Sequence, residues 1–393
     1  MRRFCIASLI AVGAISLALS GSTATAVATS PRAAPPVGTQ LSELKGSDTV
    51  ARDYLGYSVA ISGTTAVVGA PGYAGHAGRA YVFTKTRAGW KQAAELKGSE
   101  TATGDYFGYS VAISGTTAIV GAPGLARAYV FTKTGAGWKQ AAELKGSDTV
   151  VGDAFGDSVA ISGTSAVAGA DGHAKAAGRA YVFTKTGAGW KQAAELKGSD
   201  AVAGDLFGGS VATSGTSAVV GASGYARDAG RAYVFTKTGA GWKQAAELKG
   251  SDTVARDYFG DSVATSGTSA VVGASGYARD AGRAYVFAKT GAGWKQAAEL
   301  KGSDTVAGDY FGGSVAISGT TIVAGAPVFT KEAGQAYVFT NTASGWKQAA
   351  ELKGSDTVVG DTFGDSVATS GTSAVVGADG RAKAAGRAYV FEA

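Results

Sequence analysis

The 393-residue sequence contains 61 glycines, 45% hydrophobic and 9% aromatic residues, and its formal net charge is +6. The glycines follow no Gly-X-Y triplet, which excludes a collagen-like chain, and the apolar and aromatic content excludes a wholly disordered one. The charge is too small, and the basic residues are too evenly spread, to indicate a nucleic-acid-binding protein.

Residues 1–28 have the pattern of a secretory signal peptide. Two arginines precede an apolar run, Ile6–Leu19, and small residues follow it at suitable cleavage positions. The run is too short to span a membrane comfortably. Cleavage would remove Cys5, the only cysteine, and would lower the formal net charge from +6 to +4 by removing the two arginines. We therefore expect a secreted or cell-surface protein without disulfides, in which the proline-containing residues 29–38 form a linker.

The rest of the chain, residues 39–393, consists of seven copies of one unit. The sequence from Phe107 to Pro123 is FGYSVAISGTTAIVGAP, and related stretches begin at Leu55, Phe155, Phe207, Phe259, Phe311 and Phe363. A second marker, Glu-Leu-Lys-Gly, recurs every 52 residues, with one interval of 48 residues. Self-similarity of this kind indicates a repeat architecture rather than two or three unrelated domains.

Each unit contains four candidate strands separated by turn residues. In the first unit they are Ser58–Ser62, Thr65–Ala70, Arg79–Lys85 and Trp90–Leu96. Both faces of the first three strands are apolar or small, which predicts sheets covered on both sides. The fourth strand alternates between Trp, Gln, Ala and Leu on one face and charged residues on the other, which predicts a half-exposed outer edge.

Seven such sheets predict an all-β fold, a seven-bladed β-propeller of four-stranded antiparallel blades. An open β-solenoid is the alternative, although 52 residues and four turns are too many for one coil. The chain ends favour the ring. The seventh copy stops at Arg387–Ala393 without a fourth strand, and Thr39–Leu44 aligns with Lys91–Leu96. The N-terminal strand is therefore expected to complete the last blade.

The repeated FGxSVA, VVGAP and GRAYVF motifs resemble the FG-GAP repeat, the blade unit of the integrin α-subunit propeller and of many secreted bacterial proteins. The resemblance covers Leu41 to Phe391 and implies a propeller used for extracellular adhesion or ligand binding. Calcium-binding blades of this family have an acidic DxDxDG-like loop between their first two strands. Here Ser62–Thr65 and its equivalents hold no carboxylate, so we expect no metal site there and no cofactor.

The loop between the second and third strands varies most from copy to copy, and the second copy lacks four of its residues. Variation restricted to one rim is typical of a scaffold that presents a binding surface, although neutral drift at unpacked positions would give the same pattern. The candidate ligand-binding residues are Tyr73, His76, His173, Lys175, Tyr225, Arg227, Tyr277, Arg279, Phe329, Lys331, Arg381 and Lys383.

Two other repeated features have competing interpretations. Acidic pairs such as Asp48 and Asp53 recur in every unit; they could ring the channel mouth and attract cations, or accept backbone N–H groups in a turn. Repetition in every blade favours the turn. The tryptophans could stack on sugars or pack between blades, and their position on the apolar face of the fourth strand favours packing.

Catalysis has little support in the sequence. The two histidines, His76 and His173, have no metal-ligand spacing, and no motif places a base beside a serine. We therefore expect a non-enzymatic, monomeric propeller that recognises an extracellular protein or glycan and binds no nucleic acid. The alternative is a propeller hydrolase or lyase that acts on polysaccharide through two carboxylates.

Overall fold

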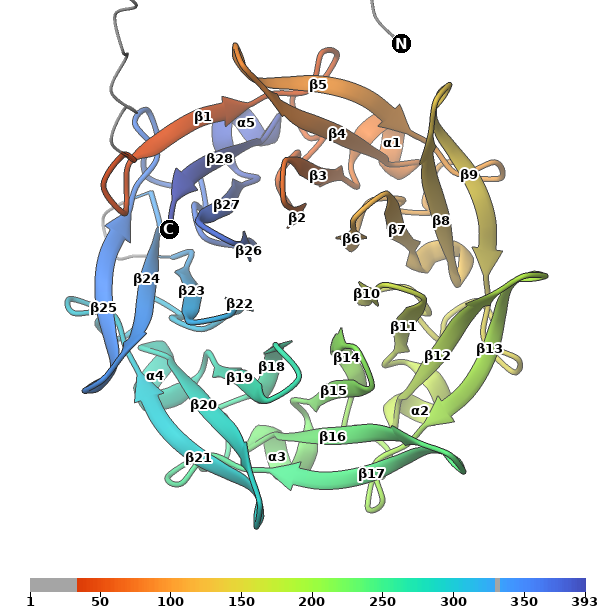
Figure 1. Ribbon diagram of the computed structural model, residues 1–393, viewed down its shortest axis with the longest axis vertical. Helices are drawn as coiled ribbons and strands as arrows, with labels where there is room; N and C mark the ends of the chain where they lie inside the picture. Colours follow the sequence, from red (N-terminus) through yellow and green to blue (C-terminus); the bar gives the residue numbers. More distant parts are fainter. Residues whose placement is uncertain (1–33, 329–332) are drawn as a thin grey trace, which may run out of the picture. The chain divides into compact units, whose positions relative to one another are not determined.

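The computed structural model describes residues 34–328 and 333–393, so the predicted signal peptide and half of the linker lie outside the described residues. The compact unit Pro36–Ala393 contains seven four-stranded antiparallel sheets, which are arranged around a central channel (Figure 1). The prediction of a seven-bladed propeller is confirmed. No helix in the described part of the chain is long and apolar enough to cross a membrane.

We number the blades in chain order, and each runs outward from the channel (Figure 1). The innermost strands are β2 (Ser58–Ser62), β6 (Val111–Ser114), β10 (Val159–Ser162), β14 (Phe207–Ser214), β18 (Phe259–Thr265), β22 (Ser314–Ser318) and β26 (Val367–Ser370). The second strands are β3 (Thr65–Ala70), β7 (Thr117–Ala122), β11 (Ser165–Ala170), β15 (Ser217–Ala222), β19 (Ser269–Ala274), β23 (Thr321–Ala326) and β27 (Ser373–Ala378).

The outer half of each blade is a long hairpin. The third strands are β4 (Arg79–Thr86), β8 (Arg127–Thr134), β12 (Arg179–Thr186), β16 (Arg231–Thr238), β20 (Arg283–Thr290), β24 (Gln335–Thr342) and β28 (Arg387–Glu392). The outermost strands are β5 (Gly89–Leu96), β9 (Gly137–Leu144), β13 (Gly189–Leu196), β17 (Gly241–Leu248), β21 (Gly293–Leu300), β25 (Gly345–Leu352) and β1 (Gln40–Leu44). Their alternating exposure matches the predicted half-exposed edge.

The N-terminal strand closes the ring as predicted. The strand β1 pairs antiparallel with β28, so the seventh sheet has the order β1-β28-β27-β26. The Nε of Arg387 donates to Glu43 Oε1 at 2.7 Å, as the Nε of Arg179 donates to Glu195 within blade 3. Near the channel, the first and last blades also meet, since Ser366 Oγ donates to the carbonyl oxygen of Gly56 at 2.6 Å.

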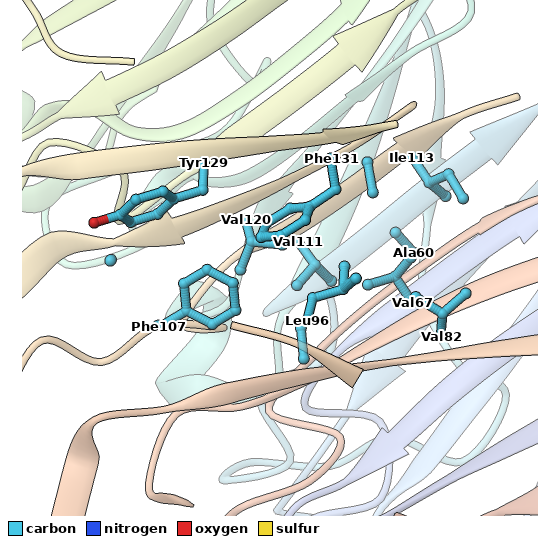
Figure 2. Close-up of a cluster of buried hydrophobic side chains, with 13 residues drawn as sticks. Ala60, Val67, Val82, Leu96, Phe107, Val111, Ile113, Val120, Tyr129 and Phe131 are labelled. Carbon is cyan, nitrogen blue, oxygen red and sulfur yellow. The ribbon is translucent and has the colours of Figure 1, made fainter. Parts of the chain in front are cut away.

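The hydrophobic core lies between neighbouring blades rather than in one centre. Between blades 1 and 2, Val67, Val82 and Leu96 of the first blade pack against Phe107 and Val120 of the second (Figure 2). Equivalent clusters occupy the other interfaces, including the one between blades 7 and 1. Each sheet is therefore covered on both faces, which explains why its middle strands have no polar face.

The Phe-Gly and Gly-Ala motifs meet across these interfaces. Phe107 is fully buried, and its ring lies 5.7 Å from that of Tyr129. The next residue, Gly108, has a φ of +92°, and a Cβ built on Gly69 of the preceding blade would lie 2.0 Å from the Gly108 carbonyl oxygen. Two glycines are required because the two backbones approach too closely for any side chain.

Candidate functional site

The variable loops and the connections between blades form one face, which we call the rim. The loops contain single turns, namely α1 (Tyr73–His76), η1 (Pro123–Leu125), α2 (His173–Ala176), α3 (Tyr225–Asp228), α4 (Tyr277–Asp280) and α5 (Arg381–Ala384). The turns α1 to α5 each accept a backbone hydrogen bond from the connection into the next blade. For example, Tyr106 N donates to His76 O at 2.8 Å and Tyr258 N donates to Asp228 O at 2.7 Å.

The first residue of most of these turns points back to the blade instead of outward. The Tyr73 hydroxyl donates to Asp48 Oδ2 at 2.8 Å, and the Arg79 guanidinium lies 4.3 Å from the centre of the Tyr73 ring. Tyr277 makes the same hydrogen bond to Asp252. Partial burial opposes ionisation of Asp48, but the hydroxyls of Tyr81 and Tyr73 outweigh it and hold the Asp48 pKa below its ordinary value.

In blades 3 and 7 the tyrosine of the turn is replaced by a basic residue, which also contacts a carboxylate of its own blade. His173 Nδ1 lies 2.9 Å from Asp153 Oδ2, and Arg381 Nη2 donates to Asp356 Oδ2 at 2.9 Å. Tyr225 contacts Asp200 in the same way as Tyr73 contacts Asp48. Five of the candidate binding residues, Tyr73, His173, Tyr225, Tyr277 and Arg381, therefore stabilise the loop itself.

The remaining described candidates are exposed and near the end of each turn. They are His76, Lys175, Arg227, Arg279 and Lys383. All five have a positive φ, between 60° and 68°, so the left-handed turn directs them away from the blade. Phe329 and Lys331 lie outside the described residues. The outward part of the rim thus carries one basic or imidazole side chain in each of these blades.

The repeated acidic pairs belong to the scaffold. The Oδ2 of Asp53 accepts the Val50 N–H at 2.7 Å, which is the turn interpretation, and Asp48 Oδ1 accepts the Tyr81 hydroxyl at 2.7 Å. Blade 2 differs, because Glu100 replaces the first aspartate and the buried Tyr129 hydroxyl makes no hydrogen bond. The residues lining the channel mouth do not include these acidic pairs.

The tryptophans pack where the packing interpretation places them. Trp138 lies against the cluster between blades 1 and 2, and Trp242 lies against the cluster between blades 3 and 4. In blade 7, Gly38 stands at the position of the tryptophan, so this blade has no aromatic ring there.

The channel changes character along its length. Its middle is lined by valine, alanine, isoleucine and threonine of the innermost strands. Its mouth on the rim face has a volume of about 300 Å³ and is lined by the residue that follows each Phe-Gly or Leu-Gly pair. In blade order these residues are Tyr57, Tyr109, Asp157, Gly209, Asp261, Gly313 and Asp365.

The mouth breaks the sevenfold symmetry of the scaffold. The rings of Tyr57 and Tyr109 lie 4.9 Å apart on one side, and three aspartates alternate with glycines on the other. Burial, together with the charges of Asp379 and Asp261, raises the pKa of Asp365 to about 7. Burial and the neighbouring carboxylate of Asp171 raise the pKa of Asp157 well above its ordinary value.

Sequence reasoning missed this mouth. The signal was present, since the third position of the FGxS motif changes from tyrosine to aspartate to glycine while its neighbours stay constant. The carboxylates at the mouth do not gather into a metal centre: no group of three or more His, Cys, Asp or Glu residues in the described part of the chain could hold a metal ion.

The repeat pattern can now be compared with known families. The FG-GAP repeat matches seven times, over residues 39–83, 90–131, 138–183, 190–235, 242–287, 294–339 and 346–391. The chain belongs to the FG-GAP repeat family. Each match covers the outermost strand of one blade and the three inner strands of the next. The first match accordingly begins with the strand β1 that completes blade 7. No sequence among the curated proteins matches this FG-GAP propeller significantly.

Solved structures with the same architecture are distant in sequence. A protein from Lactobacillus plantarum is 13% identical, with a TM-score of 0.51, and the match covers 77% of this chain and 85% of that one. Sqt1 of Saccharomyces cerevisiae is also 13% identical, with a TM-score of 0.50 and coverage of 91% and 99%. At this level of identity the similarity shows the fold alone.

Proposed function

We propose that this FG-GAP propeller is a secreted, non-enzymatic binding protein that recognises an extracellular protein or glycan through its rim. The observation that carries the proposal is the division of the variable turns into an inward and an outward part. In five described turns the first residue contacts a carboxylate of its own blade, whereas the outward side chains of these turns make none of the scaffold's repeated hydrogen bonds. Exposed loop residues on a rigid scaffold are typical of a binding surface.

Extracellular location is part of the same proposal. It is supported by the signal-like sequence of residues 1–28 and by the single cysteine within it. N-terminal sequencing of the protein recovered from the medium of an expressing culture would test it. A product retained in the cells with residue 1 intact would contradict secretion.

The rim is tested by removing its outward charges together. We expect a variant with His76, Lys175, Arg227, Arg279 and Lys383 all changed to alanine to lose binding in pull-down and glycan-array screens, while its melting temperature stays unchanged. The control removes five exposed lysines from the hairpins of the opposite face, namely Lys85, Lys133, Lys185, Lys237 and Lys289. Loss of binding in the control alone would overturn the rim assignment.

A polysaccharide hydrolase or lyase is the second candidate, and the channel mouth favours it. A carboxyl with a raised pKa beside a second carboxyl, as in Asp365 with Asp379 and Asp157 with Asp171, is the pairing that an acid and a base or nucleophile require. Release of reducing ends or unsaturated products from polysaccharides, abolished by Asp365→Asn or Asp157→Asn, would establish this activity and refute the non-enzymatic proposal.

A further inference from the structure

A groove on the rim lies between the turns of blades 4 and 5. It has a volume of about 960 Å³, and its walls come from α3, from α4 and from the connections into blades 5 and 6. Its side chains include Asp228, Arg256, Tyr258, Arg279, Asp280 and Tyr310. This volume is in the range of pockets that bind small organic molecules or a few sugar units.

Arg256 occupies a backbone position that normally requires glycine. Its φ is +72°, and five other blades have a glycine at the equivalent position with φ between 89° and 99°. Arg52 in blade 1 is the one other residue that is not glycine at this position. Arg256 therefore keeps a guanidinium at the groove at the cost of backbone strain that glycine would avoid.

Two exposed arginines and two half-buried aspartates line the groove, so that their charges balance. Arg256 and Arg279 can only donate hydrogen bonds, and Asp228 and Asp280 can only accept them when ionised. The fifth charged residue, Asp257, is buried and accepts the Val254 N–H at 2.7 Å. A polyanion would be repelled by the aspartates, and a polycation would be repelled by the arginines. Hydroxyl groups both donate and accept hydrogen bonds, so they can pair with the arginines and with the aspartates.

Two tyrosines offer flat apolar surfaces in the same groove. Tyr258 and Tyr310 are each 38% exposed, although both are large aromatic residues. Tyr106, at the equivalent position of blade 2, is also 38% exposed, but its ring lies 4.9 Å from that of His76. In the turns next to Tyr258 and Tyr310, the place of His76 is taken by Asp228 and Asp280, so no histidine covers either ring.

Close packing holds Tyr258 in position. A Cβ on Gly276 would lie 2.0 Å from the Arg256 carbonyl oxygen and 2.7 Å from a ring carbon of Tyr258. Asp228 and Asp280 are equivalent residues of successive turns, and Tyr258 and Tyr310 are equivalent residues of successive connections. The groove therefore presents tyrosine and aspartate twice, one blade apart. A ligand with repeating units fits such a duplicated surface.

We propose that the groove between α3 and α4 binds a neutral oligosaccharide, with pyranose faces stacked on Tyr258 and Tyr310 and hydroxyl groups bonded to the arginines and aspartates. The inference rests on the proposed binding function of the rim and narrows it to one place and one class of ligand. Aromatic faces receive the apolar side of a sugar ring, while the charged side chains fix its orientation.

The test uses the full-length protein on an array of neutral gluco-, galacto-, manno- and xylo-oligosaccharides, followed by titration of the best ligand. We expect Tyr258→Ala and Tyr310→Ala to weaken binding at least tenfold, and Arg256→Gly to weaken it without lowering the melting temperature. The matched controls are Tyr106→Ala and Arg52→Gly, which make the same changes in other blades and are expected to bind as the original protein does.

The outcomes separate this inference from the rim function. Binding of neutral oligosaccharides that groove variants weaken and controls retain supports both. The groove inference is overturned if the protein binds only heparin, polygalacturonate or a protein, or if the groove variants bind neutral sugars as the original protein does. In either case the rim function still stands if the five-residue rim variant abolishes the binding that is observed. No neutral-sugar binding at millimolar concentration also overturns the groove inference, and binding insensitive to every rim variant overturns the rim function.

Discussion

At the scale of single residues, six blades are held by a tyrosine hydroxyl that donates to an aspartate 33 residues earlier in the sequence. In blade 3 this bond joins Tyr181 to Asp148 at 2.8 Å. The tyrosine ring is fully buried between blades, so its hydroxyl needs a partner. Blade 2 is the natural exception, since Glu100 stands in place of the aspartate and the Tyr129 hydroxyl is unpaired.

The exception leads to a stabilising substitution. We expect Glu100→Asp to raise the free energy of unfolding by about 1 kcal/mol, because it restores a buried hydrogen bond that the six other blades have. Chemical denaturation measures the change. In a Tyr129→Phe background the same substitution is expected to give no gain, and an equal gain there would show that the hydrogen bond is not the cause.

The carboxyl of Asp365 predicts a pH dependence of stability. Burial and the charges of Asp379 and Asp261 raise its pKa from an ordinary value near 4 to about 7. The folded state therefore binds the proton more tightly than the unfolded state. This contribution is fully present below pH 4 and is lost as the pH rises towards 7.

Replacing this carboxyl with a neutral amide should remove the loss of stability between pH 4 and pH 7. We expect Asp365→Asn to raise the free energy of unfolding by about 2 kcal/mol at pH 8, because the partial exposure of Asp365 makes the gain smaller than at a fully buried site. At pH 4 the variant and the original protein should unfold alike, since both are then neutral at this position. A gain of the same size at both pH values would contradict the assigned pKa.

At the scale of elements, the outermost strand of each blade has a charged outer face and an inner face that covers the core. The strand β1 differs from the other six because it comes from the opposite end of the chain. It pairs with β28 from Gln40 to Leu44, and Gln40 accepts the Ser355 N–H just as Gln92 accepts that of Ser47. The ring is therefore closed by hydrogen bonds between β28 and β1, whereas in the other blades a hairpin turn links the third strand to the outermost strand.

Deleting this strand should open the ring. We expect removal of residues 38–44 to lower the melting temperature by more than 10 °C, since it exposes the edge of β28 and the cluster around Val390. Removal of residues 29–37 serves as the comparison and should change the melting temperature by no more than a few degrees. Equal melting temperatures for the two truncations would show that β1 does not close the ring.

At the scale of the whole molecule, closure makes the position of the termini arbitrary. The end of β28 and the start of β1 are joined by the Gly38 N–H, which donates to Glu392 O at 2.8 Å. In the other blades a short hairpin connects these two strands. The ring should therefore tolerate a covalent link at this place and a break elsewhere.

A circular permutant tests this property. It begins at Lys45, continues to Ala393, and then carries a Thr-Gly-Ala-Gly linker followed by Gly38–Leu44. We expect it to melt at or above the temperature of the original protein, because the linker removes the entropy lost when separate ends pair. A permutant that fails to fold, or that melts far below the original protein, would contradict closure by β1.

The sequence by itself determined the number of blades, the order of strands and the closing strand. These follow from a local pattern, since each unit repeats the same turns and the same apolar faces, and the missing last strand is visible at the first. The strand bounds differ by no more than a residue from those expected in the first unit, because glycine-containing turns mark each end.

Only the tertiary structure decided which candidate residues face outward. Tyr73 and Arg279 are equally variable in sequence, but Tyr73 contacts a carboxylate 25 residues away and Arg279 is exposed. The channel mouth is a stronger example. Asp261 and Asp365 are separated by about a hundred residues, and the charge of Asp261 raises the pKa of Asp365 only because the ring brings every innermost strand to a common axis.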